Sequence, residues 1–194
     1  MDHKMEMLIH EGKSFKNIVF SEKESRSREF ENCSFLNCDF SNGNFIACKF
    51  VDCVFTNCNM SNTKLNQCLL NNVTFNGCKL LGVDFSNCSD FLFIVKFNNC
   101  VLDYCSFIKR KMSKTSFNGS SMKSADFSGS DLTRSIFSNT DLTNTIFNKT
   151  NLKEADFSSA ENYIIDPEMN NIKKAKFSIT GLGGLLNKYD IIIK

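Results

Sequence analysis

The sequence predicts an all-β solenoid that is built from many copies of one five-residue unit. From Phe30 to Phe55 a large apolar residue returns at every fifth position, in the order FENCSFLNCDFSNGNFIACKFVDCVF. The same spacing recurs through most of the 194 residues. A period of five fits neither the 3.6-residue period of a helix nor the two-residue period of a strand. One unit cannot bury its own apolar residue, so the units are expected to stack on one another.

The large apolar residue of each unit, which we call the apolar repeat position, occurs in two regular runs. The first run is Phe30, Phe35, Phe40, Phe45, Phe50, Phe55, Met60, Leu65, Leu70, Phe75, Leu80 and Phe85. The second run is Phe97, Leu102, Phe107, Met112, Phe117, Met122, Phe127, Leu132, Phe137, Leu142, Phe147, Leu152 and Phe157. The residues between them are rich in Asn, Ser, Asp, Thr and Lys, which favour turns. Each unit is therefore expected to be a short extended piece followed by a turn.

The composition fits one folded domain and carries no global electrostatic signal. The chain is 42% hydrophobic and 23% charged, with a net charge of +2. Such a balance argues against disorder and against general attraction to nucleic acid or to an anionic membrane. No run approaches the 18 or so apolar residues of a membrane span, and the first residues, MDHKMEMLIHEGK, lack the apolar region of a secretory signal. We expect a cytoplasmic protein.

The ten Cys residues share one place in the unit, two residues before an apolar repeat position. They are Cys33, Cys38, Cys48, Cys53, Cys58, Cys68, Cys78, Cys88, Cys100 and Cys105. In the second half of the chain this inner slot holds other small residues, such as Thr115, Ser130 and Ala155. Cys serves there as a small buried residue, and metal ligation does not need this spacing. We predict structural thiols and no metal site.

Several units carry a sequence that is similar to a known repeat. Examples are SADFS at 124–128, GSDLT at 129–133 and EADFS at 154–158. They resemble the units of the pentapeptide-repeat family over about Phe30 to Phe157. The resemblance implies a right-handed quadrilateral β-helix with four units, or twenty residues, in each coil.

A narrower resemblance concerns the quinolone-resistance and microcin-immunity group of this family. LGVDF at 81–85 with an irregular coil after it, and IDPEMN at 165–170 followed by GLGGLL at 181–186, are similar to the immunity proteins. Members of this group are dimeric rods that resemble duplex DNA and act on DNA gyrase or topoisomerase IV. The quinolone-resistance proteins also carry long projecting loops, which this sequence lacks.

A twenty-residue coil places residues twenty apart above one another, and the second half of the chain then separates into four columns. Two columns hold Phe, and two hold Leu or Met. They are Phe97, Phe117, Phe137 and Phe157; Phe107, Phe127 and Phe147; Leu102, Met122 and Leu142; and Met112, Leu132 and Leu152. Large and smaller faces that alternate fill a square core. Six to seven coils at about 4.8 Å per coil predict a rod of roughly 30 Å.

Three segments depart from the regular spacing before residue 160. Residues 1–14 lack it and are expected to form a tail or short cap, so that the β-helix spans 15–160. Ser21–Glu29 is charged and has Ser25 at the apolar repeat position, which suggests a solvated loop. Asp90–Lys96 contains two extra residues. This insertion is either a bulge whose Phe91, Phe93 and Val95 partly pack inward or an exposed apolar knuckle, formed by Phe91 and Phe93, that binds a partner.

Residues 161–194 are predicted to form a C-terminal helix–strand cap. Lys173–Phe177 is a candidate strand, Thr180–Tyr189 a short helix and Asp190–Lys194 a second strand. The helix places Leu182, Leu185, Leu186 and Tyr189 along one stripe, although its glycines weaken it. The stripe covers the open end of the solenoid, and as a candidate dimer interface it also predicts a homodimer.

We find no candidate catalytic, cofactor-binding or metal-binding residues. The only His residues are His3 and His10, and GLGG at 181–184 lacks the Lys of a phosphate-binding loop. Asp recurs directly before the apolar repeat position, at Asp39, Asp84, Asp126, Asp131, Asp141 and Asp156. This spacing follows from turn chemistry rather than from acid–base pairing. We therefore expect no enzyme and no cofactor.

The charges do not favour a DNA mimic. A duplex carries about one charge per 1.7 Å, so a 30 Å mimic needs roughly 18 negative charges. Residues 30–160 hold 11 acidic and 12 basic residues, and Asp126, Asp131, Asp141 and Asp156 are expected on four different faces.

Basic residues instead gather near one corner as a candidate basic patch. They are Lys109, Arg110, Lys111, Lys114 and Arg134. The patch either binds an acidic or phosphate-bearing partner or is a solvated face. Arg110 occupies an inner slot, and we expect the coil to distort so that its guanidinium escapes to solvent.

The sequence thus predicts a non-catalytic protein-binding rod, with a type II topoisomerase as the leading partner and no direct contact with nucleic acid or membrane. The alternative is a structural scaffold or regulatory protein with another partner.

Overall fold

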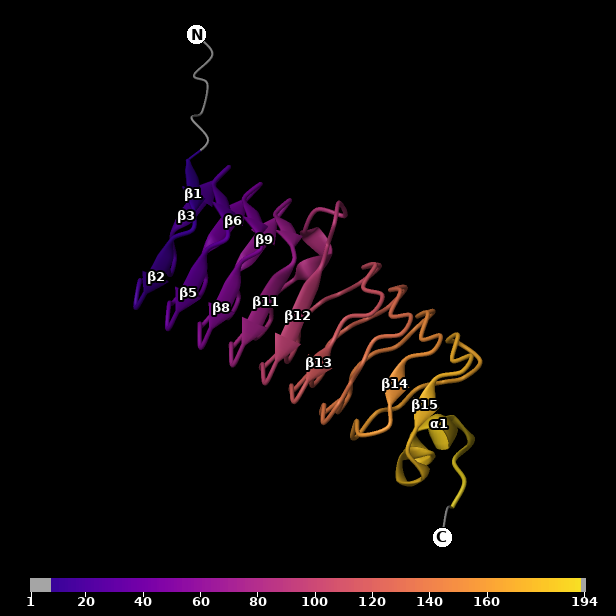
Figure 1. Cartoon of the computed structure of the whole chain (residues 1–194). Coiled ribbons are helices and arrows are strands. Elements are labelled where there is room, and N and C mark those ends of the chain that lie inside the picture. Colours follow the sequence, from indigo (N-terminus) through magenta and orange to yellow (C-terminus); the bar gives the residue numbers. More distant parts are fainter. Residues whose placement is uncertain (1–7, 193–194) are drawn as a thin grey trace.

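The computed structural model describes residues 8–192, and these form a rod of stacked coils with a small helical cap at the C-terminal end (Figure 1). The coils make a β-solenoid of about eight turns. Every strand pair is parallel, because each turn repeats the path of the turn before it. The predicted pentapeptide-repeat β-helix is confirmed.

Four faces run along the rod, and three of them begin as ladders of short strands. The β1 face contains β1 (Ile9–Glu11), β4 (Glu29–Glu31), β7 (Lys49–Val51) and β10 (Leu69–Asn71). The β2 face contains β2 (Ser14–Lys16), β5 (Ser34–Leu36), β8 (Val54–Thr56), β11 (Val73–Asn76), β12 (Val95–Asn98) and β13 (Phe117–Asn118). The β3 face contains β3 (Glu24–Arg26), β6 (Asn44–Ile46) and β9 (Lys64–Asn66).

The fourth face, which we call the bridge face, is held by isolated parallel bridges that begin at Val19 and Asp39. Similar bridges continue the other faces through the second half of the rod. The β1 face continues through Lys111, Asp131, Asn151 and Asn171, each bridged to the next. The coil keeps its four-sided shape after the strands themselves have become too short to form ladders.

The core follows the predicted columns. Phe35 and Phe55 stack with ring centroids 4.5 Å apart and 8° between the ring planes. Phe55 pairs with Phe75, twenty residues later, whereas Phe75 pairs with Phe97, twenty-two residues later. The two extra residues are thus absorbed within one turn, and the columns resume above their predecessors. The four predicted columns of the second half are confirmed.

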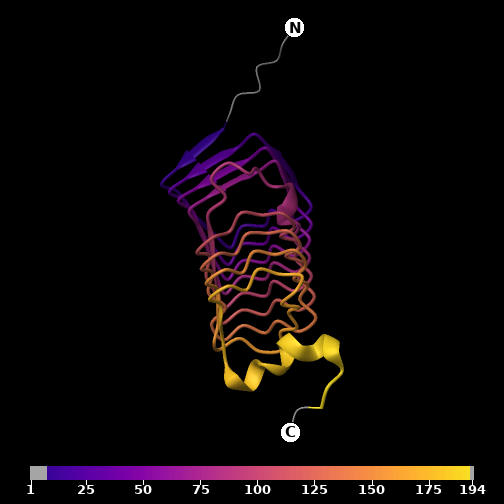
Figure 2. The same ribbon diagram turned by 90° about the vertical axis from the view of Figure 1, so that its right-hand side faces the viewer.

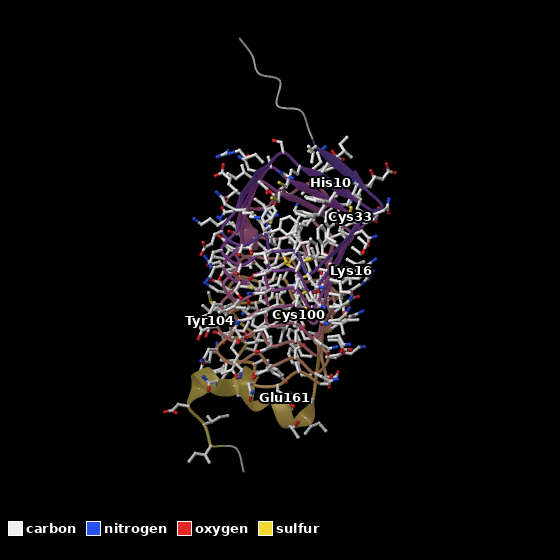
Figure 3. All side chains as sticks on the ribbon, turned by 90° about the vertical axis from the view of Figure 1, so that its left-hand side faces the viewer. His10, Lys16, Cys33, Cys100, Tyr104 and Glu161 are labelled. Atoms are coloured by element: carbon white, nitrogen blue, oxygen red, sulfur yellow. The ribbon has the colours of Figure 1, made fainter. Side chains whose placement is uncertain are left out.

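The inner slot supplies hydrogen bonds as well as small side chains. The Cys53 thiol donates to the Phe30 carbonyl at 3.3 Å, and the Thr150 hydroxyl donates to the Phe127 carbonyl at 2.9 Å. All ten thiols are buried and free (Figure 3, with Cys33 and Cys100 labelled). The residue two places after the apolar repeat position adopts a positive φ, for example 52° at Asn57. Asn tolerates this left-handed conformation, which explains why it is so common there.

The N-terminal boundary of the β-helix lies earlier than expected. β1 pairs with β4, so residues 9–14 belong to the first coil rather than to a tail; residues 1–7 lie outside the described part. The predicted loop at Ser21–Glu29 is also wrong, because β3 pairs with β6 and Ser25 is only 8% exposed. Ser25 lies in register with Phe45 of the next turn, so the coil continues although the side chain is small and polar. The rod is therefore longer than predicted, at about 40 Å for eight turns.

The C-terminal cap lies across the last coil (Figure 2). β14 (Asp156–Phe157) pairs with β15 (Lys176–Phe177), inside the strand predicted at Lys173–Phe177. The single helix predicted at 180–189 is instead three short helical turns: η2 (Ile179–Gly181), α1 (Gly183–Leu186) and η3 (Asn187–Tyr189). Residues 190–192 form no strand, and 193–194 lie outside the described part.

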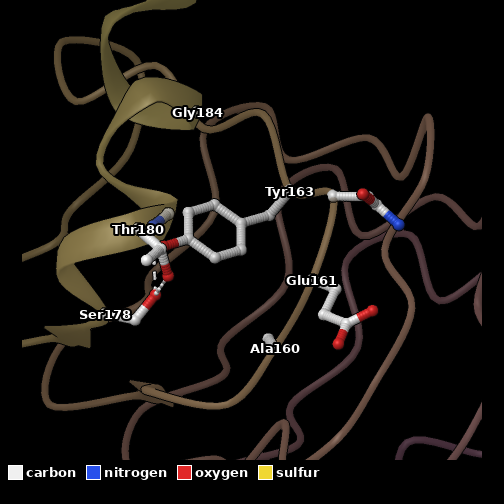
Figure 4. Close-up of a pocket in the computed structure, with 8 residues that line it drawn as sticks. Ala160, Glu161, Tyr163, Ser178, Thr180 and Gly184 are labelled. Carbon is white, nitrogen blue, oxygen red and sulfur yellow. Dashed lines mark hydrogen bonds between the residues drawn. The ribbon is translucent and has the colours of Figure 1, made fainter. Parts of the chain in front are cut away.

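The glycines of the cap explain why the helix is interrupted and how it docks. A Cβ at Gly184 would collide with the Tyr163 carbonyl oxygen, and a Cβ at Gly181 would collide with the Tyr163 hydroxyl (Figure 4). The Gly184 carbonyl accepts the Ile165 N–H at 3.0 Å. Glycine is therefore required where the cap backbone approaches the last coil. Over residues 8–192, no helix has the length and apolar character needed to cross a membrane.

Candidate interaction site

The two-residue insertion forms a projecting loop at the middle of the rod, just before β12 (Figure 1). It follows a short helical turn, η1 (Phe85–Asn87). Phe91, Leu92 and Ile94 are 69%, 48% and 45% exposed, whereas Phe93 and Val95 are buried. The segment is thus both a bulge with packed residues and an exposed apolar loop. We keep the name apolar knuckle for Phe91, Leu92 and Ile94; Phe93, a predicted member, lies beneath it.

The insertion interrupts the backbone hydrogen bonds of the β1 face. In the regular turns the Cys48 carbonyl accepts the Leu69 N–H at 2.9 Å, and the Cys68 carbonyl accepts the Ser89 N–H at 2.8 Å. The Cys88 carbonyl instead accepts a side-chain bond from Arg110, at 2.7 Å. A buried carbonyl left without a donor is costly. The Arg110 side chain therefore supplies the hydrogen-bond donor that a backbone N–H supplies in the other turns.

Arg110 is buried, with 4% of its surface exposed, and most of its guanidinium donors have partners. Its Nη1 donates to the Ser89 carbonyl at 3.0 Å, and its Nη2 also donates to the Ser86 carbonyl at 3.0 Å. Nη2 lies 3.0 Å from the Asp90 carboxylate, and the guanidinium carbon lies 5.1 Å from the Phe93 ring centroid. Only its Nε lacks a partner.

The prediction that Arg110 escapes to solvent is therefore wrong. The physical premise holds, since an unpaired buried charge would be too costly. The charge is instead paired inside the rod, because the turn that leads into the insertion supplies three carbonyls and Asp90 supplies a carboxylate. Arg110 is the residue that fastens the base of the apolar knuckle to the next turn.

The other four residues of the predicted basic patch are exposed on or beside the β1 face, directly after the knuckle. They are Lys109, Lys111, Lys114 and Arg134. The structure adds four cations in the following turns that sequence reasoning had not grouped with them: Lys149, Lys153, Lys173 and Lys174. The twenty-residue spacing of Lys153 and Lys173 was the available signal. Arg134 is paired with Glu154 at 2.6 Å.

The first half of the β1 face carries mainly acidic residues among its outward positions. Glu11, Glu29, Glu31 and Asp52 lie there, together with Lys49. Lys49 lies 3.2 Å from the Glu29 carboxylate. The knuckle thus separates an acidic half of this face from a basic half.

The recurring aspartates stabilise turns. Asp126 Oδ1 accepts the Ser128 N–H at 2.8 Å, and Asp141 Oδ1 accepts the Thr143 N–H at 3.1 Å. Burial opposes ionisation of Asp141, but hydrogen bonds from Asn162 and Thr143 outweigh it and lower its pKa to about 2. The four aspartates of the second half lie on four different faces, as expected. They form no continuous acidic face.

The cap residues of the predicted stripe divide into two groups. Leu185 packs against the core, whereas Leu182, Leu186 and Tyr189 are exposed. The Tyr189 hydroxyl donates to the Glu168 carboxylate at 3.0 Å. The structure therefore gives this stripe a docking function through Leu185 and leaves its other members available for contact.

A hollow of about 340 Å³ lies between the cap and the last coil (Figure 4). Glu161, Tyr163, Ser178 and Thr180 are among its lining residues. Burial raises the pKa of Tyr163, so its hydroxyl stays protonated. Within residues 8–192, no cluster of three or more His, Cys, Asp or Glu side chains is arranged to hold a metal ion.

Comparison with solved structures identifies the same architecture elsewhere. A trypsin-treated form of QnrB1, described as a plasmid-mediated fluoroquinolone resistance protein, matches with a TM-score of 0.64 and 20% identity. The match covers 97% of this chain and 98% of that one. HetL, a pentapeptide-repeat protein involved in heterocyst differentiation regulation in the cyanobacterium Nostoc, matches with a TM-score of 0.54 and 11% identity, over 90% and 88% of the two chains.

Comparison of the sequence with curated proteins gives no match. Family models match most of the solenoid. The model described as pentapeptide repeat region matches residues 28–107, and the model of eight pentapeptide repeats matches residues 100–139 and 135–161. These ranges together cover more than half of the chain and coincide with the stacked coils. The chain belongs to the pentapeptide-repeat family.

Proposed function

We propose that this protein is a rigid, non-catalytic rod that acts by presenting its surface to a protein partner. The observation that carries this proposal is the use of the repeated polar residues. The Cys, Ser and Thr of the inner slot donate to backbone carbonyls, and the aspartates hold their own turns. These residues maintain the fold, so function is left to the outward side chains and the knuckle.

The first partner to test is a type II topoisomerase, DNA gyrase or topoisomerase IV. Support comes from the sequence resemblance to gyrase-interacting members of the family, and from the match along nearly the whole chain to a trypsin-treated form of a protein described as a fluoroquinolone resistance protein. Within residues 8–192, the four aspartates of the second half lie on four different faces, which argues that such contact does not rest on imitation of duplex charge. Contact with the enzyme in the bacterial cytoplasm implies a cytoplasmic location, which cell fractionation tests.

A scaffold or regulatory protein with a different partner is the alternative. It is favoured by the match to HetL, whose description concerns regulation of differentiation. With either kind of partner, a homodimer through the cap remains a prediction, for which Leu182, Leu186 and Tyr189 are exposed.

The experiment is a gyrase supercoiling assay with increasing amounts of the pure protein, with and without a fluoroquinolone. Inhibition of supercoiling, or protection from the drug, at near-stoichiometric amounts supports the topoisomerase proposal. Lys114→Glu on the β1 face and Lys96→Glu on the β2 face are matched charge changes that test whether the basic patch takes part. A flat response in both arms rejects the topoisomerase and leaves the scaffold alternative.

A further inference from the structure

We propose that the β1 face binds a second copy of this chain, in antiparallel orientation, about a two-fold axis that passes through the apolar knuckle. The knuckle exposes three apolar side chains together, Phe91, Leu92 and Ile94. Such a cluster with charged residues around it is typical of the centre of an interface. The position of the knuckle and the charges on both sides of it identify a second copy as the occupant.

The knuckle lies at the middle of the β1 face. Four turns precede it, marked by β1, β4, β7 and β10. Four turns follow it, marked by the bridged residues Lys111, Asp131, Asn151 and Asn171. A two-fold axis at the knuckle therefore places every turn of the first half opposite a turn of the second half. A self-complementary interface of this kind is the commonest arrangement of protein dimers.

The symmetry also fixes which residues face each other. A two-fold axis that lies between the two faces and runs across the rod reverses the order of the turns. It keeps the direction in which the chain crosses the face. Residues before, at and after the apolar repeat position in one copy thus face the corresponding residues in the other. The turn of β1 faces that of Asn171, and the turn of β7 faces that of Asp131.

The column that follows the apolar repeat position is complementary in charge. It contains Glu11 and Glu31 in the first half and Lys153 and Lys173 in the second. The antiparallel arrangement places Glu11 opposite Lys173 and Glu31 opposite Lys153. Two-fold symmetry repeats both pairs on the other side of the axis.

The two remaining columns add further complementary pairs. Lys49 faces Asp131, and Asp52 at the corner of the face faces Arg134. Every other charged residue in these columns faces a neutral one. These pairs are Glu29 with Asn151, Leu69 with Lys111, Asn72 with Lys114, Gly12 with Lys174 and Asn32 with Glu154. No like charges face each other in these columns. The two Asp90 carboxylates lie near the axis, and each is paired with Arg110 of its own copy. Charge complementarity therefore favours this register over others.

The size of the face predicts how strong the dimer is. Eight turns give a length of about 40 Å, and three strand residues give a width of roughly 10 Å. This area is below that of a standard stable interface. The charged pairs lie at the rim, where salt screens them. We therefore expect a dimer that dissociates on dilution and weakens as ionic strength rises.

The test is sedimentation velocity across a concentration series, at low and at high salt, on four proteins. These are the unmodified chain, Glu31→Lys, Lys153→Glu and the double swap E31K/K153E. Each single change places two pairs of like charges in the dimer, and we expect at least about tenfold weaker association. The double swap restores opposite charges and is expected to recover the original affinity.

Two controls separate this surface from others. Lys96→Glu changes an exposed charge on the β2 face and is expected to leave association unchanged. Leu182→Ser with Leu186→Ser removes the exposed cap leucines, which a dimer through the cap requires and a dimer through the β1 face does not. A monomer at all concentrations, a dimer lost only in the cap variant, or a double swap as weak as the single changes would each overturn the proposal. The supercoiling result is independent of all three, because it measures action on the enzyme.

Discussion

Replacement of Arg110 by Ser tests whether this side chain fastens the knuckle to the following turn. Ser is chosen because Ser130 occupies the same inner slot one turn later and is buried there. The change removes three hydrogen bonds to the carbonyls of Ser86, Cys88 and Ser89, together with the ion pair to Asp90. It leaves those carbonyls without a donor in a turn where no backbone N–H replaces it.

The expected magnitude follows from these contacts. A hydrogen bond to a charged group is worth about 1.5–3 kcal/mol. The Asp90 carboxylate is 88% exposed, so water can reach that edge and recover part of the loss. Each buried carbonyl left without a donor costs about 1–3 kcal/mol, so three of them predict a loss of about 3–5 kcal/mol in the free energy of unfolding once access of water is allowed for. For a chain of this size that corresponds to a fall in Tm of about 6–20 °C.

Thermal unfolding followed by circular dichroism measures this loss, with Lys111→Ser as the matched control. Lys111 is the next residue, carries the same charge and is exposed, so its replacement is expected to change Tm by no more than about 2 °C. Arg110→Lys keeps the charge but not the planar fork of donors, and should give an intermediate Tm.

Limited digestion with chymotrypsin gives a second readout. If Arg110 holds the base of the knuckle, cleavage after Phe91 or Leu92 becomes faster in Arg110→Ser while the rest of the rod stays resistant. An Arg110→Ser protein that melts with the Lys111→Ser control and shows unchanged cleavage would refute the reasoning. It would mean that the carbonyls find other donors without cost.

Three further outcomes are expected. Burial raises the pKa of the Cys53 thiol to about 12, from an ordinary value of 9.0, so a disulfide reagent should react with this thiol slowly at pH 8 until the protein is unfolded. The stability that the protonated thiol contributes is full below about pH 9 and is lost as the pH rises toward 12, which alkaline denaturation measures. Gly184→Ala should lower the free energy of unfolding by about 1–3 kcal/mol, because the added methyl group collides with the Tyr163 carbonyl. Ile179→Ala changes an exposed residue of the same cap and should not lower it. Equal melting temperatures of the two variants would contradict the docking of the cap. The pKa of Asp141 is about 2 against an ordinary 3.8, so the stability that its ionised form contributes is present above pH 3.8 and is lost as the pH falls through 2. Asp141→Ala should cost about 0.5–1 kcal/mol at pH 7 and clearly less at pH 2, as urea titrations at both pH values would show.

The repeat made most of the fold predictable. Because each unit contacts only its neighbours in a solenoid, the spacing of Phe, Leu and Met determines the column to which each residue belongs. The same logic located the two extra residues before Phe97 and showed that the aspartates serve turns. It failed at Ser25, where local polarity suggested a loop although stacking against Phe45 retains the regular coil. It also failed for the cap helix, which is interrupted where glycines approach Tyr163.

By itself, the sequence determined the class of fold, the columns of the core and the position of the insertion, because these depend on the five-residue period of apolar residues. Only the tertiary structure decided what the insertion does. The pairing of Arg110 depends on which carbonyls lose their backbone donor, and this follows from the path of the turn before it rather than from any spacing. The division of the β1 face into an acidic and a basic half likewise appears only once the turns are stacked. Charges far apart in the chain become neighbours through the register between turns, and this register changes from twenty to twenty-two residues at a single turn.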